Sequence, residues 1–252
     1  MAILCFLFTG GVLLALTAWV GSDYQLADVG DAFAKLSAVA KYADERLQAT
    51  STGQPLPDPP RILADLTTVK LGLLTTLVYE VLLVTVVGGA SKQTFMGLVR
   101  ALGLDQYRVS QLWRPGLAVI AAYLLVGLYV LLVESLGIDF LQPQSTVPDA
   151  ITRDAWTLAI GWVVAVVAAP LSEELFFRGF IFGGLLRWGF WPAALIASAG
   201  FTLAHLDVGS MIPFFGVGLV LAWLYWSRAT LWDSIAFHVM FNFISFALLM
   251  AR

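Results

Sequence analysis

Three charged side chains lie within six residues of an otherwise apolar stretch: Glu173, Glu174 and Arg178. A charge at the centre of a membrane helix costs roughly 2.5–3.5 kcal/mol, so such residues face a protein interior, pair with one another or take part in chemistry. Both histidines of the chain, His205 and His238, also lie in or at the end of apolar segments. Carboxylates and imidazoles together can transfer protons in hydrolysis or hold a metal ion.

Spacing separates the two acids. Glu174 and Arg178 stand at positions i and i+4, where opposite charges on one helix face form an ion pair. Glu173 projects about 100° away around the helix, and its own i+4 position is occupied by Phe177. Glu173 is therefore the better candidate to take a proton from water.

Two kinds of hydrolytic site fit these residue types. In the first, Glu173 activates water, and a histidine together with Asn242 donates to the developing oxyanion. Asn242 follows His238 by four residues, so both side chains project from one helical face. In the second, Glu173, His205 and His238 form a zinc site with an open position for water. The residue types leave both mechanisms open, although the His-Glu-x-x-His pattern of soluble metalloproteases is absent.

Each of these residues also has a purely structural interpretation. A Glu–Arg pair, a buried histidine and an interhelical asparagine are common in helix bundles that catalyse nothing. From the residues alone, two further functions stay open: a proton-coupled transporter that uses Glu80 with the paired acids, and a non-catalytic membrane protein. The grouping of both histidines and the paired acids in the last third of the chain favours an active site.

The composition is typical of a membrane protein. Of the 252 residues, 60% are hydrophobic and only 12% are charged, whereas a soluble domain has about 25% charged residues. Apolar runs of about 20 residues recur, and this is the length that crosses a bilayer as a helix. The net charge of −3 gives no indication of nucleic-acid binding. We therefore expect an all-α, polytopic transmembrane helix bundle of about seven spans.

Polar connectors delimit the predicted spans. The spans cover residues 2–20, 67–89, 116–136, 156–188, 192–206, 211–226 and 231–250. The fourth would be roughly 50 Å long, which exceeds the ~30 Å thickness of the hydrocarbon core. Pro170 at its middle lacks a backbone N–H and leaves the carbonyl of Val166 without its helical donor. We expect one kinked crossing, followed by tight connectors at 207–210 and 227–230.

The polar segments predict further features. Hydrophobic residues at spacings of three and four predict an amphipathic loop helix over 25–48, and the prolines of 50–60 predict a stiff linker. The segment from Lys92 to Arg114 carries more basic than acidic residues and should therefore lie in the cytoplasm. Alternation of the spans then places Arg187 and Arg228 on the cytoplasmic side as well.

The polar clusters resemble the motifs of the CPBP family, also called the ABI or type II CAAX prenyl protease family. Its signature is Glu-Glu-x-x-x-Arg, Phe-x-x-x-His and His-x-x-x-Asn, each on a separate membrane helix. Here the motifs read Glu173 to Arg178, Phe201 to His205 and His238 to Asn242, in the same order. The resemblance covers about Trp156 to Met250. We accordingly divide the chain into residues 1–150, with spans one to three, and a CPBP-like core of residues 151–252, with spans four to seven.

The resemblance implies an intramembrane endopeptidase. Family members in eukaryotes remove the last three residues after a prenylated cysteine. Some bacterial members are linked to bacteriocin self-immunity, so a non-catalytic immunity protein is the alternative to an endopeptidase. The partners implied are a peptide or lipidated protein substrate and membrane lipid, with no nucleic acid. The expected location is the plasma membrane of a prokaryote.

The resemblance also implies roles for individual residues. Glu173 would be the water-activating base, and Glu174 would assist while it pairs with Arg178. The site would be completed, by metal binding or by oxyanion stabilisation, by His205, His238 and Asn242. Zinc is one option for the cofactor, and a metal-free glutamate mechanism is the other. A substrate cavity lined by Phe176, Phe177 and Phe201 would suit lipidated or helical substrates.

Overall fold

The structure is a computed structural model, and it describes residues 41, 42, 44, 45, 48, 49, 52–55, 57, 66–138, 141–143, 151, 152, 154–205 and 207–251. The chain forms two compact units, of which the first comprises Met1–Val81 with Ser145–Val164 and the second Leu82–Gln144 with Ala165–Arg252. The described residues are helical and contain no strand, so the prediction of an all-α fold is confirmed.

Two helices of the first unit continue into the second. Helix α3 spans Leu66–Ala90, and α6 spans Ala155–Val163. The side chain of Asp154 caps α6, because it accepts hydrogen bonds from the Thr157 hydroxyl at 2.6 Å and the Thr157 backbone N–H at 2.8 Å. These hydrogen bonds lower the pKa of the Asp154 carboxyl below its usual value. The cap sets the start of the helical run that leads to the paired acids.

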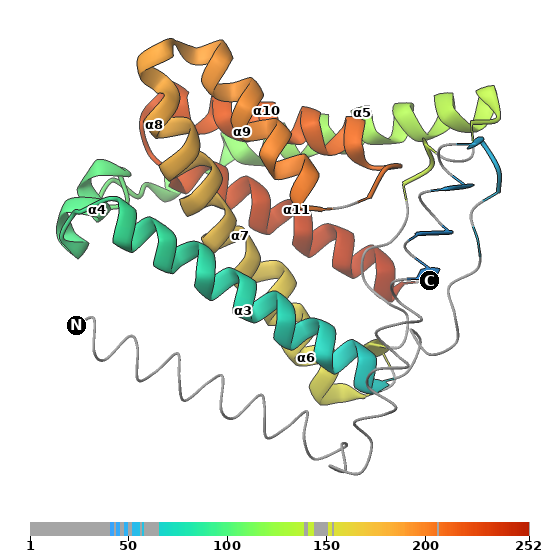
Figure 1. Ribbon diagram of the computed structural model, residues 1–252. Coiled ribbons are helices and arrows are strands. Elements are labelled where there is room, and N and C mark those ends of the chain that lie inside the picture. The colour runs from blue at the N-terminus through green and yellow to red at the C-terminus, as the bar shows by residue number, and fades with distance from the viewer. Residues whose placement is uncertain are drawn as a thin grey trace. The chain divides into compact units, whose positions relative to one another are not determined.

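The second unit holds most of the remaining helices (Figure 1). In chain order they are α4 (Phe95–Ala101), η3 (Val109–Gln111), α5 (Trp113–Leu136), α7 (Ala169–Glu173), η7 (Glu174–Phe182), α8 (Gly183–Leu185), η8 (Leu186–Trp188), α9 (Phe190–Ala204), α10 (Met211–Arg228) and α11 (Trp232–Met250). Helix α10 packs along α9, and α11 packs against α5 and α10. A buried apolar cluster that includes Phe177, Phe201, Leu221 and Phe237 joins these helices.

The predicted long fourth span is one uninterrupted helical run, Ala155–Trp188. It contains two π-helical segments, η6 (Val164–Ala168) and η7. The first comes directly before Pro170, where a regular α-helix would bring the proline ring against the carbonyl four residues earlier. A wider turn relieves that clash, and π-turns of this kind often occur at functional sites. The proline thus changes the helical register and does not break the span.

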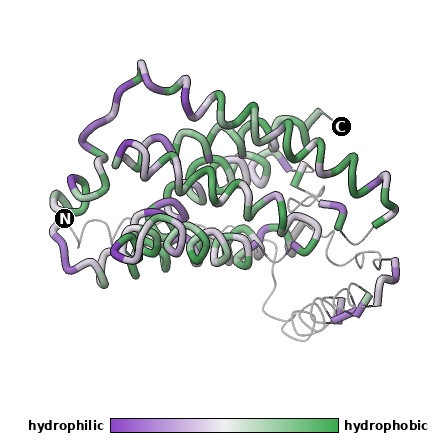
Figure 2. Tube along the Cα trace, turned by 90° about the horizontal axis from the view of Figure 1, so that it is seen from above, coloured by the Kyte–Doolittle hydropathy of each residue, from purple (hydrophilic) through white to green (hydrophobic). Residues whose placement is uncertain are grey.

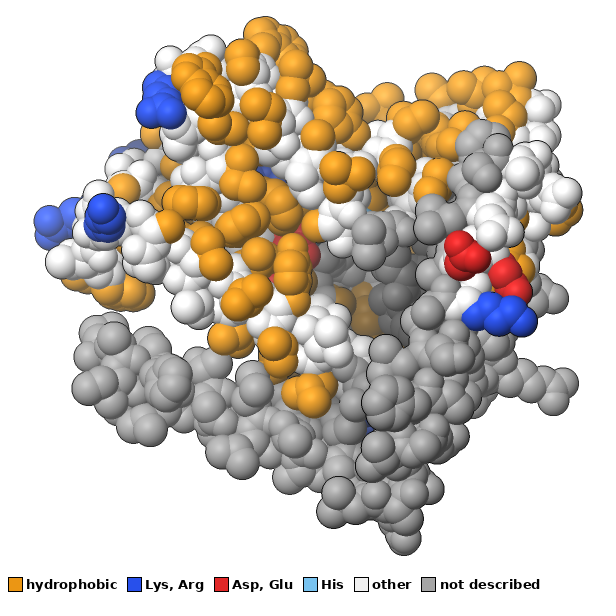
Figure 3. All heavy atoms as spheres, in the orientation of Figure 1, with side chains coloured by type: hydrophobic (Ala, Val, Ile, Leu, Met, Phe, Trp, Pro, Cys, Tyr) orange, Lys and Arg blue, Asp and Glu red, His pale blue; other side chains and the backbone are white. Residues whose placement is uncertain are grey.

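Five helices of the described chain are long and apolar enough to cross a membrane. They are Gly72–Ala90, Val109–Leu136, Ala155–Trp188, Met211–Arg228 and Trp232–Met250. Figures 2 and 3 show hydrophobic residues along most of the described helices and over much of the described surface. The chain is therefore an integral membrane protein.

The observed helices differ from several of the predicted boundaries. The fifth predicted span, 192–206, corresponds to α9, whose 15 residues make it about 22 Å long, shorter than a straight crossing. The connector predicted at 227–230 is shorter than expected, because α10 continues to Arg228 and Ala229 then adopts a left-handed conformation. The predicted span at 2–20 lies outside the described residues, as does most of the predicted helix at 25–48 and most of the linker at 50–60. The division at residue 150 stays a prediction.

Candidate active site

Glu174 and Arg178 form a fully buried ion pair at the start of η7. Both side chains have an exposed fraction of 0%, and Arg178 Nη1 donates to Glu174 Oε1 at 2.9 Å. This is the pair that the i, i+4 spacing predicts. Arg178 Nη2 also donates to the backbone carbonyl of Gly218 in α10, at 3.4 Å. The arginine therefore neutralises the acid and connects it to a second helix.

His238 of α11 is oriented by the same acid. Its Nδ1 lies 2.9 Å from Glu174 Oε1, and because the carboxylate oxygen paired with Arg178 is an acceptor, the imidazole nitrogen is the donor. A histidine held in this way by a carboxylate has a defined ring orientation and presents its other nitrogen in a set direction. That nitrogen, Nε2, lies 3.9 Å from Glu173 Oε2.

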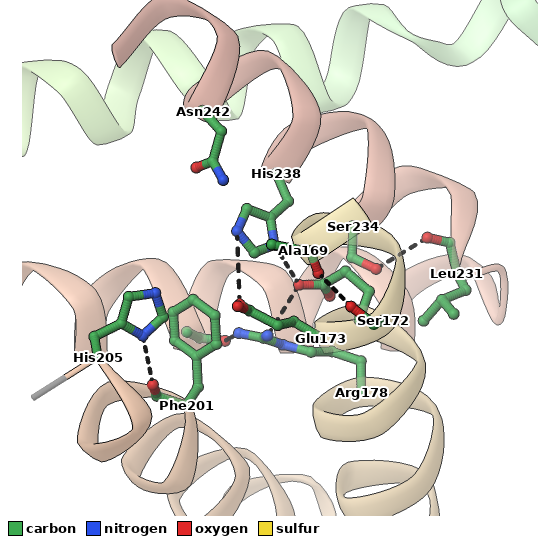
Figure 4. A network of polar contacts seen from close by, with 12 residues as sticks. Ala169, Ser172, Glu173, Arg178, Phe201, His205, Leu231, Ser234, His238 and Asn242 are labelled. Carbon is green, nitrogen blue, oxygen red and sulfur yellow. Dashed lines mark hydrogen bonds and ion pairs between the residues drawn. The ribbon is translucent and has the colours of Figure 1, made fainter. Parts of the chain in front are cut away.

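Glu173 is the more accessible of the two acids. Its side chain is 12% exposed, compared with 0% for Glu174. Figure 4 shows Glu173 directed toward the His238 ring, while Arg178 runs beneath it. The separation of 3.9 Å is longer than a direct hydrogen bond, and one water molecule can bridge atoms at this distance. The geometry thus places a partly exposed acid, whose Oε2 is buried, beside an oriented imidazole.

The ring of Phe201 in α9 packs against Arg178 and both histidines. It is 2% exposed, and the guanidinium carbon of Arg178 lies 4.3 Å from its centroid. The rings of His205 and His238 lie 4.6 Å and 5.7 Å from the same centroid. A cation over an aromatic face is stabilised by about 2 kcal/mol when both groups are desolvated. Phe201 therefore acts as a packing element between the two histidines.

His205 ends α9 and is held by its own helix. Its Nδ1 lies 2.8 Å from the carbonyl oxygen of Phe201, which can only accept, so Nδ1 carries the proton. Its Nε2 is then the nitrogen that can act on another group. The ring also packs on Phe214 at a centroid distance of 4.5 Å. Among the residues that the structure describes, no hydrogen bond joins the His205 ring to that of His238.

Asn242 connects α11 to the π-helical segment η6. Its Nδ2 donates to the carbonyl oxygen of Ala165 at 2.8 Å. In a π-helix that carbonyl would accept from the N–H five residues later, which is Pro170 and has none. The sequence predicts an unsatisfied carbonyl at Val166, because it assumes α-helical spacing. The amide of Asn242 instead satisfies the carbonyl one residue earlier.

The predicted zinc ligands do not gather into a three-residue set. Among the residues that the structure describes, no group of three His, Cys, Asp or Glu side chains could hold a metal ion. Glu173 Oε2 and His238 Nε2 face each other, while His238 Nδ1 contacts Glu174, and the described residues add no third ligand to this pair. These residues therefore do not fit a His₂Glu centre as they stand, and zinc stays a prediction.

The predicted cavity residues are mostly packing residues. Phe177 and Phe201 are 3% and 2% exposed and meet edge to face, with ring centroids 5.6 Å apart. Phe176 is partly exposed and packs on Phe177 at 5.1 Å. Of the three, Phe176 is the best placed to contact a substrate. That all three line a substrate cavity stays a prediction.

Sequence reasoning missed two backbone acceptors that hold the site, the carbonyls of Gly218 and Ala165. Backbone groups have no side-chain identity to read, although a glycine within an apolar helix can indicate a close approach of two backbones. A Cβ at Gly218 would lie 2.8 Å from Ser198 Cβ, which shows such an approach between α10 and α9.

Comparisons with known proteins cover the segment of the chain that contains these residues. Residues 155–244 match the sequence model of the family described as "Type II CAAX prenyl endopeptidase Rce1-like". A protein of Bacillus subtilis (strain 168) named "Putative membrane peptidase YdiL" is 33% identical over 81 residues, which are 32% of this chain and 33% of that protein. The match thus spans about one third of the relative's length. No solved structure matches the chain.

Proposed function

We propose that the protein is an intramembrane endopeptidase of the type II CAAX prenyl endopeptidase family, whose sequence model residues 155–244 match, and that it acts on membrane-associated or lipidated proteins. The observation that carries the proposal is the placement of Glu173 Oε2 3.9 Å from His238 Nε2, with His238 oriented by the Glu174–Arg178 pair. A nucleophile-activating group, a second proton carrier and an orienting carboxylate are the parts that hydrolysis requires.

The proposed reaction needs one water and one peptide bond. Glu173 accepts a proton from the water, whose oxygen adds to the carbonyl carbon of the substrate. His238 acts in this scheme as the imidazolium: its Nδ1–H donates to Glu174, and its Nε2–H donates to the oxyanion that develops on the carbonyl oxygen. The proton on Glu173 then passes to the leaving amine as the C–N bond breaks, so the products are a carboxylic acid and an amine.

Glu174 and Arg178 serve as positioning residues in this scheme. Because Glu174 is fully buried and already accepts from two donors on one oxygen, it holds the His238 ring and has no access to substrate. The described residues do not bring three metal ligands together, and the reaction above is written without a metal ion.

The deciding experiment compares Glu173→Gln with the wild type in cleavage of a peptide library by the purified protein. We expect loss of cleavage by at least about a hundredfold, because removal of a general base costs 10²–10⁴-fold. Glu134→Gln is the matched control, since Glu134 lies at the exposed end of α5. Full activity in Glu173→Gln would refute the proposal.

Two further measurements on the same samples separate the alternatives. Peptides in which an isoprenylated cysteine is followed by three C-terminal residues, compared with their unmodified forms, test the lipidated substrate class. Metal analysis, with cleavage measured before and after chelation, tests the zinc mechanism. Proton flux into liposomes without any cleavage would instead support the transporter alternative.

A further inference from the structure

An aromatic groove lies on the second unit, away from the acids and histidines. Its volume is about 530 Å³, and it lies between the start of α9 and the second half of α10. The lining residues are Phe190, Trp191, Leu219, Val220, Trp223 and Trp226. None of the residues proposed for catalysis is among them. A volume of this size suits a lipid chain or a small molecule.

The walls of the groove are exposed tryptophans around one phenylalanine. The Phe190 ring lies 5.2 Å from that of Trp191 and 4.9 Å from that of Trp226. The exposed fractions of Trp191, Trp223 and Trp226 are 65%, 46% and 52%. Tryptophan is enriched where the hydrocarbon core meets the head groups of a bilayer. The groove therefore has the composition of an interfacial lipid contact.

A cation stands at the rim of the groove. The guanidinium carbon of Arg114, at the start of α5, lies 5.5 Å from the centroid of the Trp223 ring. Arg114 Nη2 donates to the hydroxyl of Ser227 at 3.1 Å. The side chain is half-buried, and within the described part of the chain no carboxylate pairs with it.

The neighbouring arginines differ in this respect. Arg228 is neutralised by Asp233 at 3.2 Å, and Arg178 is neutralised by Glu174. Arg114 keeps its positive charge beside an apolar groove, and a half-buried cation favours an anionic partner. Basic side chains also gather over α4 and near α8, at the left of Figure 3. The sequence predicts that this basic end faces the cytoplasm, where the leaflet carries anionic lipids.

We propose that this groove binds an anionic phospholipid of the cytoplasmic leaflet. An acyl chain occupies the groove between Trp191 and Trp223, and the phosphate accepts hydrogen bonds from Arg114, whose guanidinium is held by the Ser227 hydroxyl. Arginine matches a phosphate group by two parallel hydrogen bonds, and Trp223 holds the guanidinium plane. The ligand would thereby tie α5 to α9 and α10.

The test uses the full-length protein purified in detergent and freed of lipid. Phosphatidylglycerol and phosphatidylcholine with the same acyl chains are added, and native mass spectrometry and the thermal unfolding midpoint report binding. We expect phosphatidylglycerol to bind at least about tenfold more tightly, because a charge-assisted hydrogen bond contributes at least that factor. Arg114→Gln should abolish the preference, whereas Arg114→Lys should retain part of it.

Two variants make the result specific. Trp191→Leu should weaken the binding of both lipids, since Trp191 forms the wall of the groove opposite Trp223. Trp191 is too exposed to be needed for folding. Arg187→Gln is the control, because Arg187 is exposed and stacks on Trp188 outside the groove. Equal affinity for the two lipids, or an unchanged preference in Arg114→Gln, would overturn the proposal. Stabilisation by inorganic phosphate alone, equal to that by phosphatidylglycerol, would also overturn it.

Discussion

The crossing of α9 and α10 gives a sharp test of how the site is held, through the substitution Gly218→Ala. A Cβ at this position would lie 2.8 Å from Ser198 Cβ and 3.0 Å from Ser198 Cα and Oγ. Such contacts require α10 to move by a few tenths of an ångström. The carbonyl of the same residue accepts from Arg178 at 3.4 Å, which is already near the limit of a hydrogen bond. The shift therefore breaks the hydrogen bond that anchors Arg178 to the Gly218 carbonyl.

The expected magnitude follows from two opposing terms. Overpacking of a tight contact costs about 1–3 kcal/mol, whereas alanine in place of glycine in a helix gains about 1 kcal/mol. Gly218→Ala should thus lower the free energy of unfolding by up to about 2 kcal/mol. Gly216→Ala is the matched control, since a Cβ added at Gly216 would meet no atom within 4 Å. It should be neutral or stabilising by up to about 1 kcal/mol.

Peptide cleavage by Gly218→Ala should also fall, because the Gly218 carbonyl helps to hold the site. Loss of the Gly218 anchor loosens Arg178, then Glu174, then the orientation of His238, so kcat should fall by about tenfold with little change in KM. The double variant Gly218→Ala/Ser198→Gly removes the clashing Cβ and hydroxyl and should recover most of the activity. Peptide cleavage and thermal unfolding in detergent measure both quantities. If Gly218→Ala matches Gly216→Ala in both, the anchoring role is wrong.

Two other substitutions test the buried polar contacts. Arg178→Gln leaves the Glu174 carboxylate buried without its cation and should lower the free energy of unfolding by about 3–5 kcal/mol. The double variant Arg178→Gln/Glu174→Gln should lower it clearly less. Equal losses for the single and the double variant in denaturant unfolding would contradict this. Asn242→Leu leaves the Ala165 carbonyl without a donor and should cost about 1–2 kcal/mol, so an unchanged unfolding midpoint would count against the contact.

Much of the site could be predicted from the sequence because its side chains are costly in a membrane. Apolar surroundings made Glu174 and Arg178 conspicuous, and a four-residue spacing was enough to predict their pairing. The cost of polar groups in lipid also predicted that the histidines would face the acids inside the bundle, and His238 does contact Glu174. Reasoning from cost and spacing works here because lipid offers polar groups no other partner.

The features that the sequence did not predict depend on how the helix backbones pack. The sequence placed the unsatisfied carbonyl at Val166, whereas the π-helical turn places it at Ala165. Spacing could not show that Phe201 packs between two histidines. It also could not show that α9 is only 15 residues long, because hydropathy reports an apolar run and not the helix that forms within it.

The π-helical segment η6 also has a consequence for the evolution of this span. A π-turn holds one residue more than the α-turn it replaces, so loss of one residue there would restore regular spacing. The acids downstream would keep their direction, because a π-turn and an α-turn each complete about one rotation, but the Pro170 ring would then lie against the Ala165 carbonyl that accepts from Asn242. The span should tolerate substitution at the exposed Val167 but not its deletion, and the deletion should insert normally yet fail to cleave peptide. Related chains can therefore be expected to vary in side chains here, and to conserve the count of residues between Ala165 and Glu173.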